Sequence, residues 1–222
     1  MLINQKLGTF GSLAVVFTDR ALESSKPTHP FRCGSCTQCI TDCPTGALSA
    51  EGLDARLCIS YWTIEHRGMI PRHFRKQIGE WVFGCDICQD VCPWNRKAPH
   101  ADETIWRPKE AHISPHLIQW LNTPDEVLDQ QLLGSPLRRA KPQGLKRNAC
   151  IVLANQGCVQ AIPVLTQVAL SHSSDVVRAT AVWACRVLGY AEIISLSAQD
   201  HATSVRTECE AKLDDLIQPL PV

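Results

Sequence analysis

Residues 33–44 read Cys-Gly-Ser-Cys-Thr-Gln-Cys-Ile-Thr-Asp-Cys-Pro, and residues 85–93 read Cys-Asp-Ile-Cys-Gln-Asp-Val-Cys-Pro. The first stretch has the C-x2-C-x2-C-x3-C-P spacing of two-cluster bacterial ferredoxins, in which three thiolates bind one [4Fe–4S] cluster and the fourth binds the other. The second stretch repeats the last three cysteines of this pattern, but Val82 stands where its first cysteine is expected. The spacing predicts two clusters and single-electron transfer.

Cys58 supplies the ligand that the second run lacks, because it is the only cysteine between residues 33 and 92 that neither run uses. The last cysteine of each run then binds the cluster held mainly by the other run. The predicted ligands are Cys33, Cys36, Cys39 and Cys92 for the first cluster, and Cys43, Cys58, Cys85 and Cys88 for the second. A zinc ribbon or a set of disulfides is the alternative, but neither explains two runs that end in Cys-Pro.

The remaining cysteines are Cys150, Cys158, Cys185 and Cys209, which lie on apolar faces of a helical pattern. Free cysteine in such a place behaves as a small buried hydrophobic residue. We therefore expect these four to belong to the core.

Charge and hydropathy exclude several classes of protein. The 22 basic and 22 acidic residues among 222 give no net charge, so any contact with nucleic acid must come from a local patch. No stretch approaches 18 consecutive apolar residues, and the first residues lack the long apolar region of a signal peptide. We expect a cytoplasmic protein that does not engage a membrane.

The chain divides into three predicted parts, and the fold class is predicted to be α+β. Residues 1–30 contain a strand pair around Gly8 and Gly11 that needs further strands to form a sheet. Residues 31–98 form the two-cluster module. Residues 99–222 begin as a proline-containing linker and continue as helices.

The helical part shows an approximate internal repeat. Leu145, Val177 and Val205 are each followed by a basic residue, with spacings of 32 and 28 residues. Gly157 and Gly189 follow the first two bases by eleven residues, where a left-handed helix cap favours glycine. HEAT-like repeats are the favoured interpretation, and an ordinary amphipathic helix bundle is the alternative.

The residues that flank the cysteines form motifs more specific than that of a ferredoxin. Residues 43–47 read Cys-Pro-Thr-Gly-Ala, residues 53–65 read Leu-Asp-Ala-Arg-Leu-Cys-Ile-Ser-Tyr-Trp-Thr-Ile-Glu, and Gly-Cys-Asp-Ile-Cys-Gln-Asp-Val-Cys-Pro-Trp-Asn spans 84–95. In these motifs the chain resembles the epoxyqueuosine reductases. The resemblance implies reduction of epoxyqueuosine to queuosine in the anticodon loop of tRNA. It also implies cobalamin as the reactive cofactor, with electrons reaching it through two [4Fe–4S] clusters from a donor such as a flavodoxin or ferredoxin system.

The resemblance also has a departure. Members of the family carry a further N-terminal portion of the cobalamin domain, including the proton-donating acid, so residues 1–30 are expected to be a remnant of that domain. No catalytic residue is assigned, and the chain alone is expected to be a poor enzyme. The predicted cobalamin neighbours are Ser60, Tyr61, Glu65 and His66, although these residues could instead pack the loop between the two cysteine runs.

Two basic clusters are candidates for contact with RNA phosphates. Five bases lie within residues 138–147, and a second group lies within residues 67–76. The predicted tRNA contacts are Arg67, Arg72, Arg138, Arg139, Lys146 and Arg147. The competing interpretations are a ferredoxin-type electron-transfer protein with a helical docking module, and a helical scaffold that the clusters stabilise.

Overall fold

The computed structural model of the chain describes residues 2–24, 33–99, 113, 115–212 and 214–216. Their secondary structure is helical, and strand-like pairing in these ranges is limited to two isolated bridges, Asn4–Gly8 and Leu48–Leu53. The α+β prediction is therefore wrong for the described residues. None of their helices is long and apolar enough to cross a membrane.

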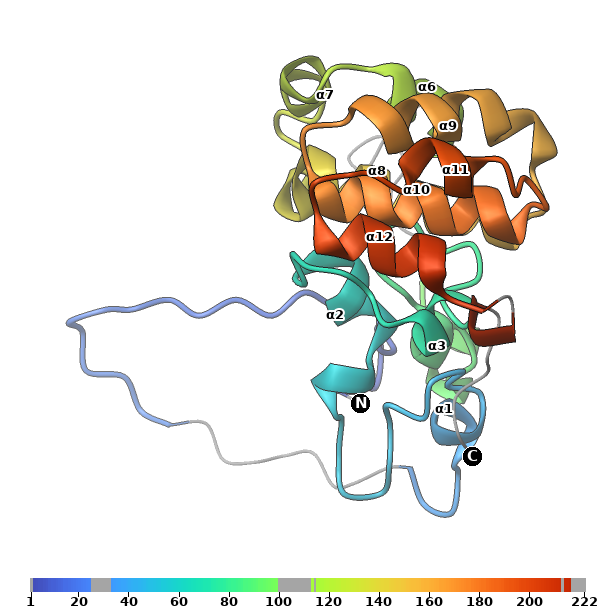
Figure 1. The fold of residues 1–222 in the computed structure, drawn as a ribbon. Coiled ribbons are helices and arrows are strands. Elements are labelled where there is room, and N and C mark those ends of the chain that lie inside the picture. Colours follow the sequence, from blue (N-terminus) through green and yellow to red (C-terminus); the bar gives the residue numbers. More distant parts are fainter. Residues whose placement is uncertain (1, 25–32, 100–112, 114, 213, 217–222) are drawn as a thin grey trace.

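The predicted strand pair near the N-terminus reduces to the Asn4–Gly8 bridge. Residues 10–18 are extended but pair with no strand, and Val15, Val16 and Phe17 lie largely exposed. The segment projects from the body of the molecule in Figure 1. A hairpin alone is marginal in water, which explains why no sheet forms here. Assignment of residues 1–30 to a cobalamin domain stays a prediction.

The cysteine-containing part has only short helices. They are α1 (Gln38–Thr41), η1 (Ala55–Leu57), α2 (Ile59–Ile64), α3 (Arg72–Arg75), α4 (Ile87–Asp90) and η2 (Pro93–Lys97). The helices α1 and α4 follow the first cysteines of the two runs and pack against each other. Most of the predicted linker, residues 100–112 and 114, lies outside the described residues.

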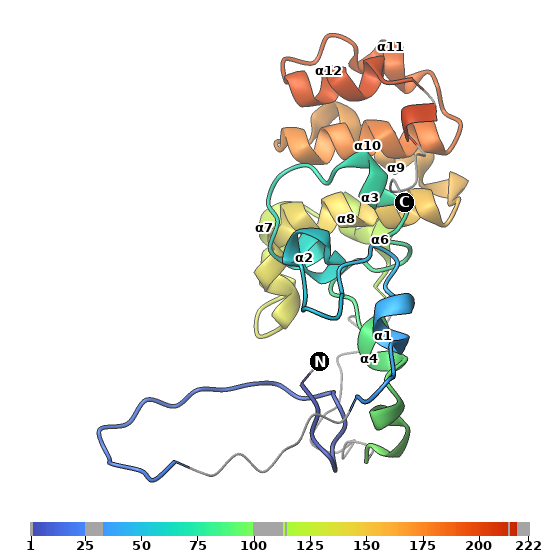
Figure 2. The same ribbon diagram turned by 90° about the horizontal axis from the view of Figure 1, so that it is seen from below.

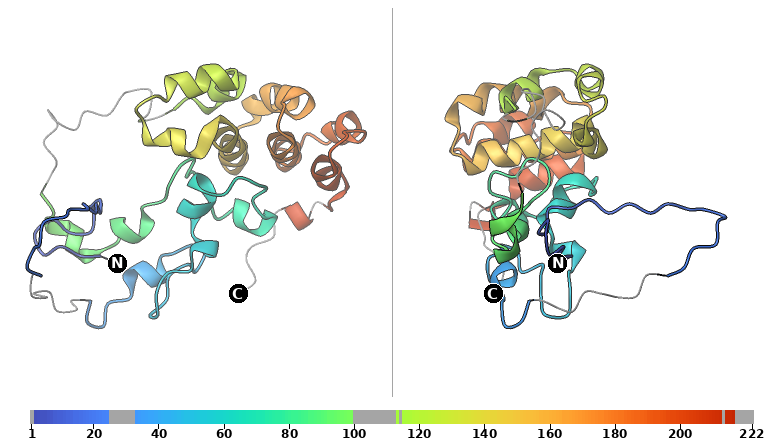
Figure 3. Two further views of the ribbon diagram at one scale, coloured as in Figure 1. Left: turned by 90° about the vertical axis from the view of Figure 1, so that its left-hand side faces the viewer. Right: turned by 180° about the vertical axis from the view of Figure 1, so that it is seen from behind.

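The C-terminal part forms two rows of helices. One row consists of α8 (Lys141–Asn155), α10 (Asp175–Val187) and α12 (Thr203–Glu210), which pack in that order and face the cysteine module (Figures 1 and 2). The other row consists of α6 (Leu117–Asn122), α9 (Ile162–Ser171) and α11 (Ile193–Ser197), and Figure 3 shows both rows end on. The helices α7 (Asp125–Gln131), η3 (Pro136–Ala140), η4 (Val159–Ala161) and η5 (Asp214–Leu216) complete the part.

The sequence features that suggested a repeat occupy equivalent places in these rows. Leu145, Val177 and Val205 are fully buried, one in each helix of the inner row. Gly157 and Gly189 have φ of 64° and 85° and end α8 and α10, as predicted. In both ends the next residue donates its N–H to a carbonyl five residues earlier, the pattern of a Schellman cap. The rows agree with HEAT-like stacking, which stays a prediction.

One apolar core joins the cysteine module to the helical rows. Ile59, Ile70, Phe74 and Ile78 of the module are buried in the same cluster as residues of α8, α9 and α10. Because burial of apolar area contributes about 25 cal/mol per Å², this shared core fixes the module on the helical part.

Candidate metal centre

Four predicted ligands line one cavity. Cys33, Cys36, Cys39 and Cys92 enclose a space of about 210 Å³, together with Ile3, Gln38, Pro93 and Trp94. The four cysteines come from both runs, and α1 and α4 bring the runs together. They are the set predicted for the first cluster, and the cavity fits a group held by thiolates within an apolar wall.

The other four cysteines form a second group. Burial raises the pKa of Cys85 to about 11 against the opposing effect of a backbone hydrogen bond from Ile87, and the nearby thiols of Cys58, Cys88 and Cys43 raise it further. Burial and the charges of Cys58, Cys39 and Cys43 likewise raise the pKa of Cys88. Such thiols are protonated at neutral pH unless a metal displaces the proton, so metal binding here releases protons.

Cys43 has a different environment from its neighbours. Burial alone would raise its pKa, but hydrogen bonds from Thr45, Ala47 and Leu48 outweigh burial and lower it. The Ala47 N–H lies 3.3 Å from the Cys43 sulfur. Hydrogen bonds to sulfur favour the thiolate, which is the form that binds metal.

The two cysteine groups suit clusters better than single ions. Within the described ranges, no three His, Cys, Asp or Glu side chains are arranged to hold one metal ion. A [4Fe–4S] cluster distributes its four cysteines over four irons, so its ligands need not converge on one point. The assignment of each cysteine to a cluster remains a proposal.

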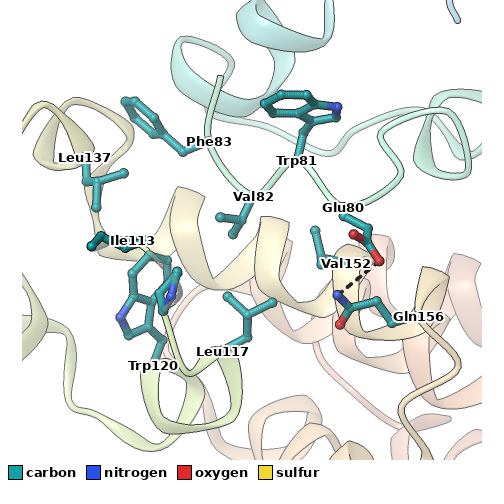
Figure 4. A pocket seen from close by; sticks show the side chains of 11 residues that line it. Glu80, Trp81, Val82, Phe83, Ile113, Leu117, Trp120, Leu137, Val152 and Gln156 are labelled. Atoms are coloured by element: carbon teal, nitrogen blue, oxygen red, sulfur yellow. Dashed lines mark hydrogen bonds between the residues drawn. The ribbon is translucent and has the colours of Figure 1, made fainter. Parts of the chain in front are cut away.

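Val82, which stands where the second run would have its first cysteine, has a packing role. Its side chain points into a pocket of about 420 Å³ between residues 80–83, α6 and α8, where Trp81, Leu117 and Val152 also contribute (Figure 4). Position 82 is therefore part of the apolar contact with the helical rows. Cys58, at the start of α2, is among the thiols nearest to Cys85.

The four residues predicted to contact cobalamin lie in or just after α2. Tyr61 and Glu65 are exposed, whereas Ser60 and His66 are partly buried. The His66 Nε2 atom is 3.1 Å from the Met69 carbonyl oxygen, and its ring meets the Trp62 ring edge-on at 4.5 Å. Burial lowers the pKa of His66, with Arg147 adding to the effect and the Met69 hydrogen bond opposing it. Cobalamin binding by this surface stays a prediction.

The exposed bases gather where α2 meets η3. Arg139 is 69% exposed and forms a 2.6 Å ion pair with Glu65, while Arg138 pairs with Asp129 at 2.8 Å. Arg67 donates to the carbonyls of Arg139 and Ala140 and so ties η3 to the end of α2. The Arg139–Glu65 pair places a predicted RNA contact beside a predicted cofactor contact.

Lys146 and Arg147 do not belong to that surface, which corrects the prediction of a continuous basic patch. They are 3% and 1% exposed. Lys146 pairs with Asp125 at 2.8 Å and donates to the Thr123 carbonyl. Arg147 donates to the carbonyls of Trp62, His66 and Gly68. Phosphate contact needs accessible donors, so these two residues have structural roles.

The exposure of Arg72 lies between that of the exposed arginines on η3 and that of the buried bases on α8. It pairs with Glu208 of α12 at 3.0 Å and donates to the Thr207 carbonyl. Its neighbour Arg75, buried, pairs with the same Glu208 at 2.8 Å and lies 5.0 Å above the Trp183 ring. Glu208 and its two partners therefore join α3 to the helical rows. Nothing in the spacing of the sequence distinguishes these bases from exposed ones.

The arrangement of the cysteines is that expected of a protein with two iron–sulfur clusters, and a comparison with known families supports this class. The family described as "4Fe-4S double cluster binding domain" matches residues 32–95, which include all eight predicted ligands. The chain thus carries a two-cluster iron–sulfur module joined to a helical region.

Comparisons that span most of the chain are more specific. The epoxyqueuosine reductase of Leadbetterella byssophila is 40% identical over 152 residues, which are 68% of this chain and 49% of that protein. The Pseudomonas aeruginosa protein of that name is 37% identical over 189 residues, 84% of this chain and 52% of its own length. The resemblance to epoxyqueuosine reductases is therefore confirmed, and the chain spans about half the length of these relatives.

Solved structures agree with the sequence relatives. An epoxyqueuosine reductase from Bacillus subtilis superposes with a TM-score of 0.78 at 31% identity, covering 88% of this chain and 53% of that one. An epoxyqueuosine reductase solved with a tRNA-Tyr epoxyqueuosine-modified stem loop gives a TM-score of 0.76 at 31% identity, covering 86% and 52%. The arrangement of module and helical rows is thus shared with this family.

Proposed function

We propose that this chain provides the electron-transfer module and part of the tRNA-binding surface of an epoxyqueuosine reductase. The observation that carries the proposal is that Cys33, Cys36, Cys39 and Cys92 line one cavity, while Cys43, Cys58 and Cys88 lie close enough to Cys85 to affect its pKa. The resemblance to epoxyqueuosine reductases adds the reaction, the reduction of epoxyqueuosine to queuosine in tRNA.

The two cysteine groups account for the delivery of electrons. Cys33, Cys36, Cys39 and Cys92 would hold one cluster, and Cys43, Cys58, Cys85 and Cys88 the other. Each cluster passes one electron at a time, whereas conversion of the epoxide to an alkene consumes two electrons and two protons and releases the oxygen as water. A one-electron donor of the flavodoxin or ferredoxin class would therefore have to reduce the module twice for each product.

The end of α2 is the proposed meeting point with cobalamin and RNA. When bound, cobalamin supplies the metal-centred reduction that cleaves the carbon–oxygen bond. Of the residues there, Tyr61 and Glu65 are accessible, and the Glu65–Arg139 pair connects them to the exposed bases on η3. Arg138, Arg139 and Lys141, all exposed, are the proposed contacts with tRNA phosphates.

An anaerobic assay tests this function. The 222-residue chain is supplied with cobalamin, a chemical reductant and tRNA containing epoxyqueuosine, and queuosine is measured by mass spectrometry. We expect two clusters to assemble and turnover to be weak or absent, because no proton-donating acid is assigned within the chain and a missing donor commonly costs about 10²-fold or more.

A second arm supplies the N-terminal half of a related epoxyqueuosine reductase in trans or as a fusion. Turnover should then rise, and the same fusion with Cys58→Ala should remain inactive. Assembly of both clusters without tRNA binding or rescue would instead favour a ferredoxin-type electron-transfer protein.

A further inference from the structure

A buried polar pair connects the two segments that carry Cys58 and Cys85. Thr63, one turn beyond Cys58 on α2, accepts a hydrogen bond from the Gly84 N–H at 3.0 Å and donates to the Ile59 carbonyl at 2.9 Å. The side-chain amide of Asn148 on α8 donates to the carbonyls of Thr63 and Val82, both at 2.8 Å. These bonds hold α2 directly against residues 82–84.

Arg147 fixes the orientation of the Asn148 amide. Its Nε and Nη2 atoms donate to the Asn148 Oδ1 atom at 3.0 and 2.8 Å, so the amide nitrogen is directed toward the two carbonyls. Asn148 and Thr63 are both fully buried. A buried network whose donors and acceptors are all used specifies one arrangement of the segments that it joins.

The second cluster needs such a link more than the first. In the regular motif a cysteine at position 82 would be fixed near Cys85 by the chain itself. Here Cys58 replaces it from 27 residues away (58 to 85), so the distance between the two ligands depends on non-covalent contacts. Thr63 and Asn148 provide those contacts at the position of the missing ligand, because they bind Val82 and Gly84.

We propose that Thr63 and Asn148 are positioning residues for the second [4Fe–4S] cluster, which compensate for the absence of a cysteine at position 82. This inference rests on the two-cluster assignment given above. Neither residue touches the cluster in this scheme. Both act by holding Cys58 and Cys85 at the separation that binding to the same cluster requires.

Asn155 offers a matched control on the same helix. Its side-chain amide also donates two hydrogen bonds, to the carbonyls of Arg75 and Gly79, both at 2.9 Å. The segment it holds carries no ligand cysteine. Asn155→Ala therefore removes the same number and kind of bonds between α8 and the module as Asn148→Ala does, without affecting the link between Cys58 and Cys85.

The experiment compares wild type, Asn148→Ala, Asn155→Ala and Cys58→Ala as full chains reconstituted anaerobically. Iron and sulfide are counted, and the dithionite-reduced proteins are examined by electron paramagnetic resonance with redox titration. Wild type and Asn155→Ala should hold about eight irons. Asn148→Ala should fall toward about four, or show a shifted potential for one cluster, and its unaffected signal should match the one that Cys58→Ala retains.

Thr63 supplies an independent variant pair if Asn148→Ala does not fold. Thr63→Val, which keeps the shape but removes the hydroxyl, should weaken or shift the same signal, and Thr63→Ser should restore it. Equal spectra and iron contents for Asn148→Ala and Asn155→Ala, or wild-type behaviour of Thr63→Val, would overturn the positioning role. Fewer than two clusters in the wild type would instead reject the cluster assignment itself.

Discussion

Replacement of Glu208 by Gln should destabilise the whole molecule, because this carboxylate neutralises two arginines of the cysteine module. Glu208 is 3% exposed and accepts from Arg75 at 2.8 Å and from Arg72 at 3.0 Å. Arg75 is itself 2% exposed, and burial lowers its pKa while Glu208 opposes that effect. Loss of the carboxylate leaves the Arg75 charge buried without its counterion.

The expected size follows from the burial of the pair. Removal of one partner of a buried ion pair costs about 3–5 kcal/mol, and the amide of Gln keeps one acceptor for Arg75, so the lower end of that range applies. For a chain of this length each kcal/mol lowers Tm by about 2–4 °C. A loss of about 3 kcal/mol thus predicts a fall in Tm of roughly 6–12 °C.

Thermal unfolding of the cluster-loaded protein, followed anaerobically by circular dichroism at a fixed scan rate, measures this effect. The matched control is Asp129→Asn, which breaks the solvent-exposed pair with Arg138 and should leave Tm nearly unchanged. If Glu208→Gln lowers Tm by less than about 2 °C, or if the two variants lower it equally, the ion pair does not stabilise the contact between α3 and α12.

Two further predictions concern the ligands and the RNA surface. Cys58→Ala should reduce the iron content from about eight to about four per chain, measured by iron analysis and electron paramagnetic resonance; retention of both clusters would show that Cys58 is not a ligand. Binding of a tRNA anticodon stem loop should weaken as salt rises, and Arg138→Gln with Arg139→Gln should reduce the slope of log K against log salt by about 1–2. Lys146→Gln is the comparison, because its buried amine should change stability without changing that slope; an equal change in slope would contradict the assignment of Lys146 to the interior.

The cysteine spacing allowed more of the site to be predicted than of the fold. The first run places three of its cysteines close together through local geometry, and Cys58 was proposed as a ligand because it was the one cysteine of the module left unassigned. The predicted sheet failed for a physical reason: residues 13–17 have the composition of a buried strand, but strand formation depends on neighbouring strands, and in the described structure these side chains meet solvent. Local pattern does not encode that dependence.

Basic residues were predictable in number but not in environment. Residues 138–147 form one basic run in the sequence, yet η3 presents Arg138 and Arg139 to solvent. On α8, Lys146 is buried against Asp125, and Arg147 is buried against carbonyls of the cysteine module. The helical period could not have separated them, because every residue of α8 from Gly144 to Ala154 is buried, including both bases. Nothing in the sequence indicated the role of Asn148, because its amide donates to backbone carbonyls of segments that are distant in the sequence.

The short helices of the module explain why the helical rows matter for redox chemistry. The helices α1 and α4 have four residues each and lack side-chain caps, and α2 has six. Isolated helices of this length are unstable in water, so their geometry must be imposed from outside. Cluster ligation can fix α1 and α4, which lie within the cysteine runs. It cannot alone fix α2, which contributes only Cys58 at its first end. The contacts from α8 through Arg147 and Asn148 supply the missing constraint at its other end. Under the proposed ligand assignment, the helical region therefore sets the geometry of the second cluster.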